Sequence, residues 1–305
     1  MVKVGCCGFP TSMKKYFESF SLVELNSTFY QYPRMETVEG WREKASEDFE
    51  FSVKAHQDIS HKAKMEIDDV SLQAFERMKQ ICKALNSKIL LIQTPGSFRS
   101  DRLGEAEKFF REVDREGLIL VWETRGPYWE TTETYRKLGR VLEELNVTHV
   151  TDPFRLMPAY VSEIVYFRLH GLGKQMYYYQ YTDEELRKLK EFALLYEREG
   201  KDVYVLFNNL SMFEDGMRFM KYLSNGAFPK ITKLSGLASI LEVIEKTRYP
   251  IAKSTLIKRF GWRIVELEEG KQVRLETVLA KLSSKSFSSA DKLVEEIKSV
   301  KKIVT

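Results

Sequence analysis

The sequence has no long apolar segment and little that resembles an export signal. It contains no run of about 18 apolar residues, the length that a membrane-spanning helix needs. Met1 is followed directly by the strand-like segment 2–4 instead of a basic and then apolar leader. We therefore expect neither secretion nor membrane insertion, and we predict a cytoplasmic protein.

Cysteine and histidine are also scarce. The three cysteines, Cys6, Cys7 and Cys82, are odd in number and two are adjacent, which fits neither a disulfide framework nor a CxxC metal knuckle, so we expect reduced thiols. Four histidines are too few for a multinuclear zinc site. No cofactor is predicted. A single divalent ion is kept as an alternative, on the ligands Glu123, Asp152 and His170.

The overall composition is that of a soluble globular chain. Hydrophobic residues make up 43% and charged residues 30% of 305 residues, which excludes disorder and collagen and leaves room for about two domains. The net charge of +4 is too small to identify an anionic partner. It is uneven, however: residues 236–305 carry 14 basic and 9 acidic residues (+5), and residues 1–235 carry 34 and 35 (−1).

Short apolar or aromatic segments alternate with longer amphipathic ones along the first part of the chain. We predict strands at 2–9, 22–29, 49–56, 88–94, 118–124, 148–152, 164–170 and 203–208. We predict helices near 11–19, 36–47, 67–86, 102–116, 131–146, 183–199 and 211–224. Eight strands with seven intervening helices favour a (β/α)8 TIM-type barrel of the α/β class, and no GxGxxG follows the first strand to indicate a dinucleotide fold.

The remainder of the chain has a different pattern. We predict helices at 237–247, 253–260, 276–283 and 290–299, with a hairpin turn at 268–271. The predicted domains are therefore a barrel over residues 1–235 and a small, basic, mainly helical domain over residues 236–305.

Nearly every predicted strand ends in polar residues, and barrel enzymes carry their reactive groups at these carboxyl ends. Each such residue alone is often a structural ion pair, but a ring of them is more polar than a core requires. Alternation places Glu24, Asn26 and Thr28 on one face of the second strand. The other members of the ring are Lys54, His56, His61, Gln93, Glu123, Arg125, Asp152, Arg168, His170, Asn208 and Asn209.

The same strand ends resemble the serial motifs of the YecE-like family, domain of unknown function 72. The matching segments are 23–30 (VELNSTFY), 51–55 (FSVKA), 60–61 (SH), 93–95 (QTP), 122–125 (WETR), 168–171 (RLHG) and 207–209 (FNN). The resemblance covers residues 2–225 and implies a TIM-type barrel, without a known reaction. The chain departs from the family at CCGF (6–9), where small hydroxyl residues precede Gly-Trp, and at TPG (94–96), where Leu-Pro-Pro is usual.

The tail resembles a small helical family of unknown function through YPIAK (249–253), VLAKL (278–282) and FSS (287–289). A basic winged helix is the alternative, with residues 253–260 as a helix and 264–275 as the wing.

These patterns support an enzyme that binds a phosphorylated, sugar-like or nucleotide-like substrate, with acid/base chemistry of hydrolase or isomerase type. The catalytic residues are predicted to be Glu24, Lys54, Glu123 and His170. The substrate-binding residues are predicted to be Asn26, Thr28, Tyr30, His61, Gln93, Arg125, Asp152, Arg168, Asn208 and Asn209. In one variant, Lys54 is a Schiff-base nucleophile.

Two other functions remain open at this point. One is a metal-assisted phosphodiester hydrolase. The other is a nucleic-acid-binding protein that uses the basic tail, including Trp262 and Arg263. The predicted partner is therefore an anionic small molecule or a nucleic acid.

Overall fold

The computed structural model describes residues 1–268 and 270–301, which form two compact units. The first unit consists of residues 1–170, 187–208 and 212–220, and the second of residues 171–186, 209–211 and 221–305. The domain boundary predicted between residues 235 and 236 stays a prediction.

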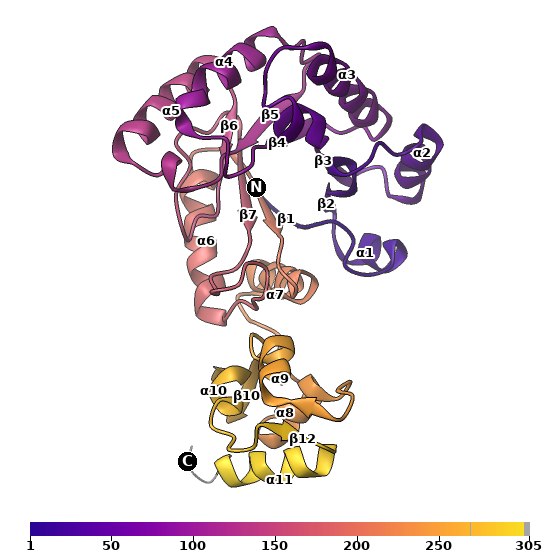
Figure 1. Cartoon of the computed structure of the whole chain (residues 1–305). Coiled ribbons are helices and arrows are strands. Elements are labelled where there is room, and N and C mark those ends of the chain that lie inside the picture. Colours follow the sequence, from indigo (N-terminus) through magenta and orange to yellow (C-terminus); the bar gives the residue numbers. More distant parts are fainter. Residues whose placement is uncertain (269, 302–305) are drawn as a thin grey trace. The chain divides into compact units, whose positions relative to one another are not determined.

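The first unit is built around eight parallel strands (Figure 1). They are β1 Val2–Cys7, β2 Leu22–Leu25, β3 Glu50–Lys54, β4 Ile89–Gln93, β5 Ile119–Glu123, β6 Thr148–Val150, β7 Ile164–Leu169 and β8 Asp202–Phe207. Their order is β6-β5-β4-β3-β2-β1-β8-β7, and a parallel bridge between Thr151 and Phe167 joins the two outer strands. The sheet therefore closes into a barrel, as the strand and helix pattern predicts.

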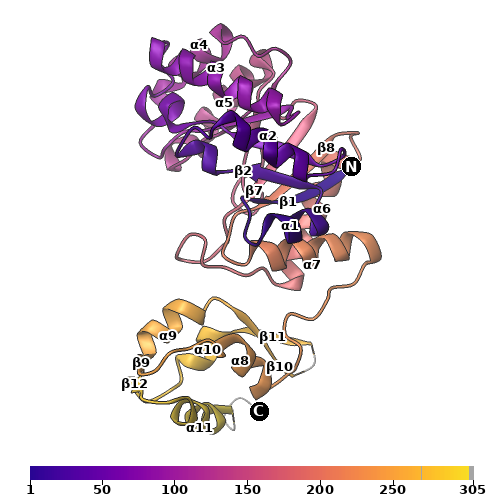
Figure 2. The ribbon, with the colours of Figure 1, turned by 90° about the vertical axis from the view of Figure 1, so that its right-hand side faces the viewer.

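Helices follow the strands and surround them (Figure 2). They are α1 Met13–Ser19, α2 Met35–Lys44, α3 Asp69–Ala84, α4 Leu103–Glu112, α5 Thr132–Leu145, α6 Asp183–Glu197 and α7 Met212–Asn225. Local sequence fixes their ends. The Asp68 carboxylate and the Ser71 hydroxyl form a reciprocal capping box at α3, and Thr131 caps α5. Asn146 ends α5 in the left-handed conformation that asparagine tolerates.

Strand register shows which side chains point into the barrel, because neighbouring Cα partners face the same side of a sheet. Leu91, Tyr166 and Leu206 belong to one buried apolar cluster that also takes in side chains of β1, β2, β5 and β6. Lys54 pairs with Leu91 and Arg168 pairs with Leu206, so both point inward with that cluster.

One predicted strand is shorter than expected, and this corrects a prediction. β2 ends at Leu25, Asn26 has helical backbone angles, and Ser27–Phe29 forms a 3-10 turn. The strand alternation therefore stops after Glu24, and the prediction that Glu24, Asn26 and Thr28 share one face is wrong. The Thr28 hydroxyl donates instead to the backbone carbonyls of Leu25 and Lys54, at 2.9 and 2.7 Å.

The second unit is mainly helical, with two short pairs of strands. Its elements are α8 Leu237–Ile244, β9 Ile251–Ala252, α9 Lys253–Phe260, β10 Ile264–Glu268, β11 Lys271–Arg274, α10 Leu275–Leu279, β12 Ser286–Phe287 and α11 Ala290–Lys301. β10 pairs with β11 and β9 pairs with β12, both antiparallel. The hairpin proposed as a wing is present, but β9 does not join it, whereas a winged helix would build one sheet from these strands.

The loop that follows β7 folds with this second unit. The Gln180 side chain accepts the backbone N–H of Ile264 at 2.8 Å, and the Arg274 guanidinium donates to the Gln180 carbonyl at 3.2 Å. The same guanidinium lies 4.0 Å from the centre of the Tyr179 ring. Gly171, at the start of this loop, has a φ of +88°, and a Cβ there would lie 2.3 Å from the Cβ of Tyr179. Only glycine fits this position without strain.

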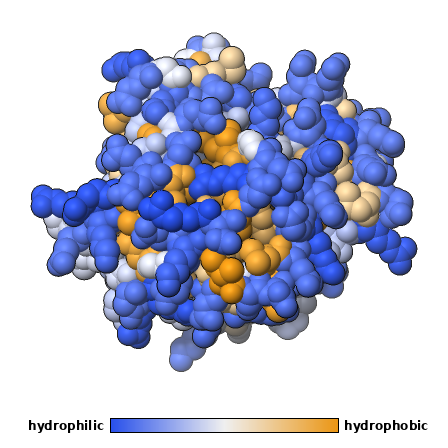
Figure 3. Space-filling view, turned by 90° about the horizontal axis from the view of Figure 1, so that it is seen from above, coloured by the Kyte–Doolittle hydropathy of each residue, from blue (hydrophilic) through white to orange (hydrophobic). Residues whose placement is uncertain are grey.

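The surface agrees with the high charged fraction of the sequence. Seen from above, hydrophilic side chains cover most of the face in Figure 3, and hydrophobic ones gather near its centre. None of the helices that the structure describes is both long and apolar enough to cross a bilayer.

Candidate functional site

Arg168 is the centre of a buried ionic cluster at the carboxyl ends of the strands. Its side chain is 1% exposed and donates to both oxygens of Glu24, through Nε at 2.9 Å and Nη2 at 2.7 Å. Its Nη1 also donates to Glu123. Tyr166 donates to Glu24 at 2.9 Å, and its hydroxyl lies 2.7 Å from that of Ser52. Both oxygens of Glu24 are thus occupied within the protein, as a buried bidentate pair requires.

Glu123 lies between three nitrogen-bearing side chains. Besides the contact with Arg168, it accepts a hydrogen bond from Arg125 Nε at 2.9 Å, and its carboxylate is 3.7 Å from His170 Nε2. Burial opposes ionisation, but the cations of Arg168 and Arg125 outweigh it and hold the pKa of Glu123 well below its usual range. Glu123 is therefore an anion at neutral pH and a poor proton acceptor.

His170 is held in its neutral form. Burial and the cations of Arg168 and Arg125 lower its pKa to about 3, although Glu123 acts in the opposite direction. Arg125 Nη2 lies 3.1 Å from His170 Nε2. Because a guanidinium can only donate, Nε2 accepts this bond and the ring proton resides on Nδ1.

The pKa of Asp152 is shifted in the opposite direction from that of Glu123. Burial raises its pKa to about 6, partly offset by the hydrogen bonds that it accepts from the backbone N–H groups of Phe154 and His170, at 3.1 and 3.3 Å. Its carboxyl group therefore titrates near neutral pH, in contrast with that of Glu123.

Among the cations of this cluster, Lys54 lacks a counter-ion in contact. It is 6% exposed, yet its Nζ makes no hydrogen bond or ion pair with any residue that the structure describes. The nitrogen lies 4.0 Å from the centre of the Phe29 ring. Burial and the nearby charge of Arg168 lower the pKa of Lys54 to about 8, while Glu24 and Glu123 act to raise it.

Two amides close to these groups are also without partners. Register pairs Gln93 with Glu123, and the Gln93 side chain is 6% exposed without a hydrogen bond to another described residue. The same holds for the half-buried amide of Asn208, which directly follows β8. His61 lies in a short π-helical turn, Asp58–Lys62, and burial together with Lys54 and Arg125 lowers its pKa.

Other predicted residues make contacts away from this cluster or are exposed. The Asn26 amide donates to the Cys7 carbonyl at 3.3 Å, and Tyr30 is 69% exposed. His56 stacks on Tyr32 and contacts Asp58 at 3.1 Å. Asn209 belongs to the second unit, where it donates to the Tyr179 carbonyl at 2.8 Å. Their roles in binding stay predictions.

Sequence reasoning missed Tyr166, Ser52 and Phe29, which support the cluster. Tyr166 and Ser52 stand in apolar segments, where such residues indicate packing, and Phe29 is an aromatic residue among polar neighbours (NSTFYQ). The two-residue alternation of a strand could have identified two of them. Tyr166 stands two residues before Arg168, and Ser52 stands two before Lys54, so the side chains of each pair share one face of their strand.

The predicted metal ligands are engaged in other contacts. Glu123 and His170 bind arginines, and within residues 1–268 and 270–301 no three His, Cys, Asp or Glu side chains are grouped so that they could hold a metal ion. The three cysteines are buried and unpaired with one another.

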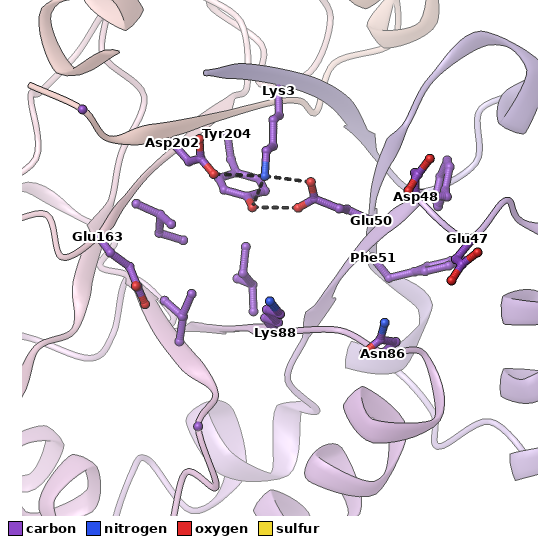
Figure 4. Close-up of a pocket in the computed structure, with 16 residues that line it drawn as sticks. Lys3, Glu47, Asp48, Glu50, Phe51, Asn86, Lys88, Glu163, Asp202 and Tyr204 are labelled. Carbon is purple, nitrogen blue, oxygen red and sulfur yellow. Dashed lines mark hydrogen bonds and ion pairs between the residues drawn. The ribbon is translucent and has the colours of Figure 1, made fainter. Parts of the chain in front are cut away.

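The opposite end of the barrel holds a cavity of about 840 Å³ at the amino ends of β1, β3, β4, β5, β7 and β8. Figure 4 shows its paired charges: Lys3 contacts Glu50 at 2.7 Å and Asp202 at 3.1 Å, and Tyr204 donates to Glu50 at 2.7 Å. Lys88 and Glu163 also line it. The central ions at this end compensate one another, unlike Lys54 at the other end.

Comparison with known proteins agrees with this architecture. A model of the family described as "Protein of unknown function DUF72" matches residues 8–232, and one of a family of unknown function, DUF5789, matches residues 236–301. Solved DUF72 family proteins from Enterococcus faecalis and Thermotoga maritima superpose with TM-scores of 0.61 and 0.58. Both are 23% identical to this chain in sequence. The match to the Enterococcus protein covers 73% of this chain and 97% of that protein, and the match to the Thermotoga protein covers 74% of this chain and all of that protein (100%).

Two curated proteins are similar in sequence. The UPF0759 protein YecE of Escherichia coli is 31% identical over 142 residues, which is 46% of this chain and about half, 51%, of YecE. The UPF0759 protein YunF of Bacillus subtilis is 25% identical over 228 residues, 65% of this chain and 80% of YunF. With its barrel matched along most of its length by the family model, the chain belongs to the DUF72 family.

Proposed function

We propose that the barrel is an enzyme that binds an anionic, sugar-like or nucleotide-like substrate at the carboxyl ends of its strands and transfers protons there. The observation that carries the proposal is the pair of buried, unpartnered side chains, Lys54 and Gln93. The polar atoms of these two side chains are not fully enclosed by the described residues, so a ligand can reach them and supply the missing hydrogen bonds.

Charge supports an anionic ligand. Lys54, Arg125 and Arg168 face the two carboxylates of Glu24 and Glu123, and neutral His170 adds no charge. Arg168 contacts Glu24 and Glu123, and Arg125 contacts Glu123, so Lys54 is the cation without a carboxylate in contact. An anionic group near Lys54 would give this cation a counter-ion and raise the pKa of its amine.

The pKa values suggest which residues move protons. A general acid or base works best with a pKa near the working pH. Lys54, at about 8, and Asp152, at about 6, meet this condition. We therefore assign proton transfer to these two residues. Glu24 and Glu123 act as positioning residues that fix Arg168 and Arg125, and Gln93 and Asn208 orient substrate hydroxyls.

The proposal is tested by thermal shift and calorimetry with sugar phosphates, nucleotides, short oligonucleotides and divalent metals. A ligand at about 100 times its Kd stabilises the folded protein by about 2.7 kcal/mol. We expect one anionic class to stabilise the wild type and to lose its effect in Lys54→Met. The control is Lys88→Met, which removes the same charge at the opposite end of the barrel. Equal stabilisation of both variants would refute the assigned site.

The same panel addresses the two alternative functions. Stabilisation by divalent metals alone would favour the metal-assisted phosphodiester hydrolase. Binding of oligonucleotides that weakens steeply with salt would favour nucleic-acid recognition, for which α9 offers exposed Lys258 and Arg259.

A further inference from the structure

We infer that Lys54 is a nucleophilic amine that captures the carbonyl group of its substrate as a Schiff base, so that the substrate is an aldehyde or ketone carrying an anionic group. This inference rests on the proposed function, because it places the reacting carbonyl in the same site. It adds a covalent step and a substrate class.

The surroundings of Lys54 differ from those of half-buried Lys3 and buried Lys79 in the barrel unit. Lys3 contacts Glu50 and Asp202, and Lys79 contacts Glu76 and Glu116 at 2.9 and 2.8 Å. Such carboxylates hold the proton on the amine. Lys54 Nζ has no partner of this kind among the described residues and rests on the face of Phe29. Its nitrogen is therefore available to a ligand.

The charges around Lys54 favour the neutral amine that a nucleophile needs. Arg168 and Arg125 act on it as cations, and His61, whose own pKa is lowered, adds no charge at neutral pH. Glu24 and Glu123 oppose the cations without outweighing burial. With a pKa of about 8 in place of 10.5, roughly half of the amine is neutral at pH 8, against well under 1% for an ordinary lysine.

The step needs no cofactor or redox partner. The Nζ lone pair attacks the carbonyl carbon, a C–N bond forms, and the carbonyl oxygen takes up a proton to give a carbinolamine. The nitrogen then forms the C=N bond as the C–O bond breaks and the hydroxyl leaves, with one more proton, as water. One amine and one carbonyl thus yield one imine and one water.

The anionic part of the substrate class follows from exposure. Arg125 is 25% exposed, whereas Arg168 is 1% exposed. Arg125 is therefore the guanidinium that a substrate carboxylate or phosphate can reach while its carbonyl lies at Lys54. Guanidinium binds both oxyanions well.

Reductive trapping tests the inference on the full chain. The protein is incubated at pH 7 with glyoxylate, or with neutral propionaldehyde, and cyanoborohydride, which reduces an imine to a stable secondary amine. Peptide mass mapping then follows each lysine over time. We expect glyoxylate to modify Lys54 on the order of 10- to 100-fold faster than Lys88. Lys54→Arg should abolish the fast adduct and leave the slow labelling of Lys88 unchanged.

Each outcome decides something different. Labelling of Lys54 no faster than that of Lys88 overturns the inference, and if anions still bind in a Lys54-dependent way, the proposed function stands. Equal rates with glyoxylate and propionaldehyde overturn the anionic part of the substrate class. The pH dependence of the wild-type rate, expected to rise to a plateau above about pH 8, needs no variant and remains decisive if Lys54→Arg does not fold.

Discussion

Arg168 donates two parallel hydrogen bonds to Glu24, at 2.9 and 2.7 Å, from a position closed to solvent. Removing one partner of such a pair leaves a buried charge without compensation. We expect Glu24→Gln to lower the free energy of unfolding by about 3 kcal/mol or more in urea titrations.

The double variant Glu24→Gln/Arg168→Met should be more stable than the sum of the single changes predicts, because it removes both charges together. Arg111→Ala, which breaks exposed pairs with Glu107 and Glu144, is the control and should leave the urea midpoint nearly unchanged. Additive single changes would show that the two residues do not act as a pair.

Lys54→Met should stabilise the protein, an unusual effect for a buried site. The folded pKa of Lys54 is lowered, so its charged form is disfavoured in the native state. This destabilisation is fully present below pH 8 and disappears as the pH rises from about 8 to 10.5. At pH 7 we expect Lys54→Met to unfold with a free energy about 1 to 3 kcal/mol higher than the wild type.

The matched variant is Lys3→Met. Its partners Glu50 and Tyr204 raise the pKa of Lys3 against the effect of burial, so its loss should destabilise the protein. If both variants shift stability in the same direction at pH 7, Lys54 is not an uncompensated cation.

Buried neutral histidines predict loss of stability in mild acid. Burial lowers the pKa of His149 to about 4 and that of His170 to about 3, while the unfolded chain protonates both near pH 6.5. Below pH 6.5 the unfolded state therefore binds more protons, and each site contributes a loss of about 1.4 kcal/mol per pH unit. Urea titrations at pH 7, 6 and 5 should show this fall.

His149→Gln should reduce the slope between pH 6.5 and 4. His149 contacts the Thr124 hydroxyl at 3.0 Å and accepts the backbone N–H of Ala159 at 3.1 Å, and glutamine retains similar hydrogen-bonding capacity. An unchanged slope in this variant would assign the acid sensitivity to other groups.

The loop after β7 should depend on Arg274. This residue holds the carbonyl of Gln180 and the ring of Tyr179, so Arg274→Ala should increase amide hydrogen exchange within residues 171–186. Lys281→Ala, an exposed change in the same unit, should leave exchange in this loop unaltered. Protection that persists in Arg274→Ala would show that the remaining contacts suffice.

The barrel itself could be predicted because each strand is a compact apolar segment between amphipathic helices. All eight strands lie within a residue of the predicted ranges or inside them, as with Ile89–Gln93 against 88–94. The end of β2 could not be predicted, because asparagine, serine and threonine fit a strand end and a 3-10 turn equally well. Only the hydrogen bonds of Thr28 to two strand carbonyls decide it.

The sequence predicts the ring of polar residues as a set, but not which of its members bind one another. Periodicity places Glu24, Lys54 and Glu123 at strand ends without showing which cation each carboxylate binds. That Arg168 takes Glu24 and leaves Lys54 without a partner depends on side-chain distances across the barrel. Likewise, nothing in the local sequence of residues 171–186 indicates that they fold with the C-terminal unit.

The two ends of the barrel also determine how the molecule can be attached to a surface. Lys88 is exposed at the amino ends of the strands, and the three native cysteines are buried. A Lys88→Cys variant therefore offers a single accessible thiol for maleimide coupling. Because parallel strands place their carboxyl ends on the opposite side, protein coupled in this way would present Lys54 and its neighbours to the solution and not to the support.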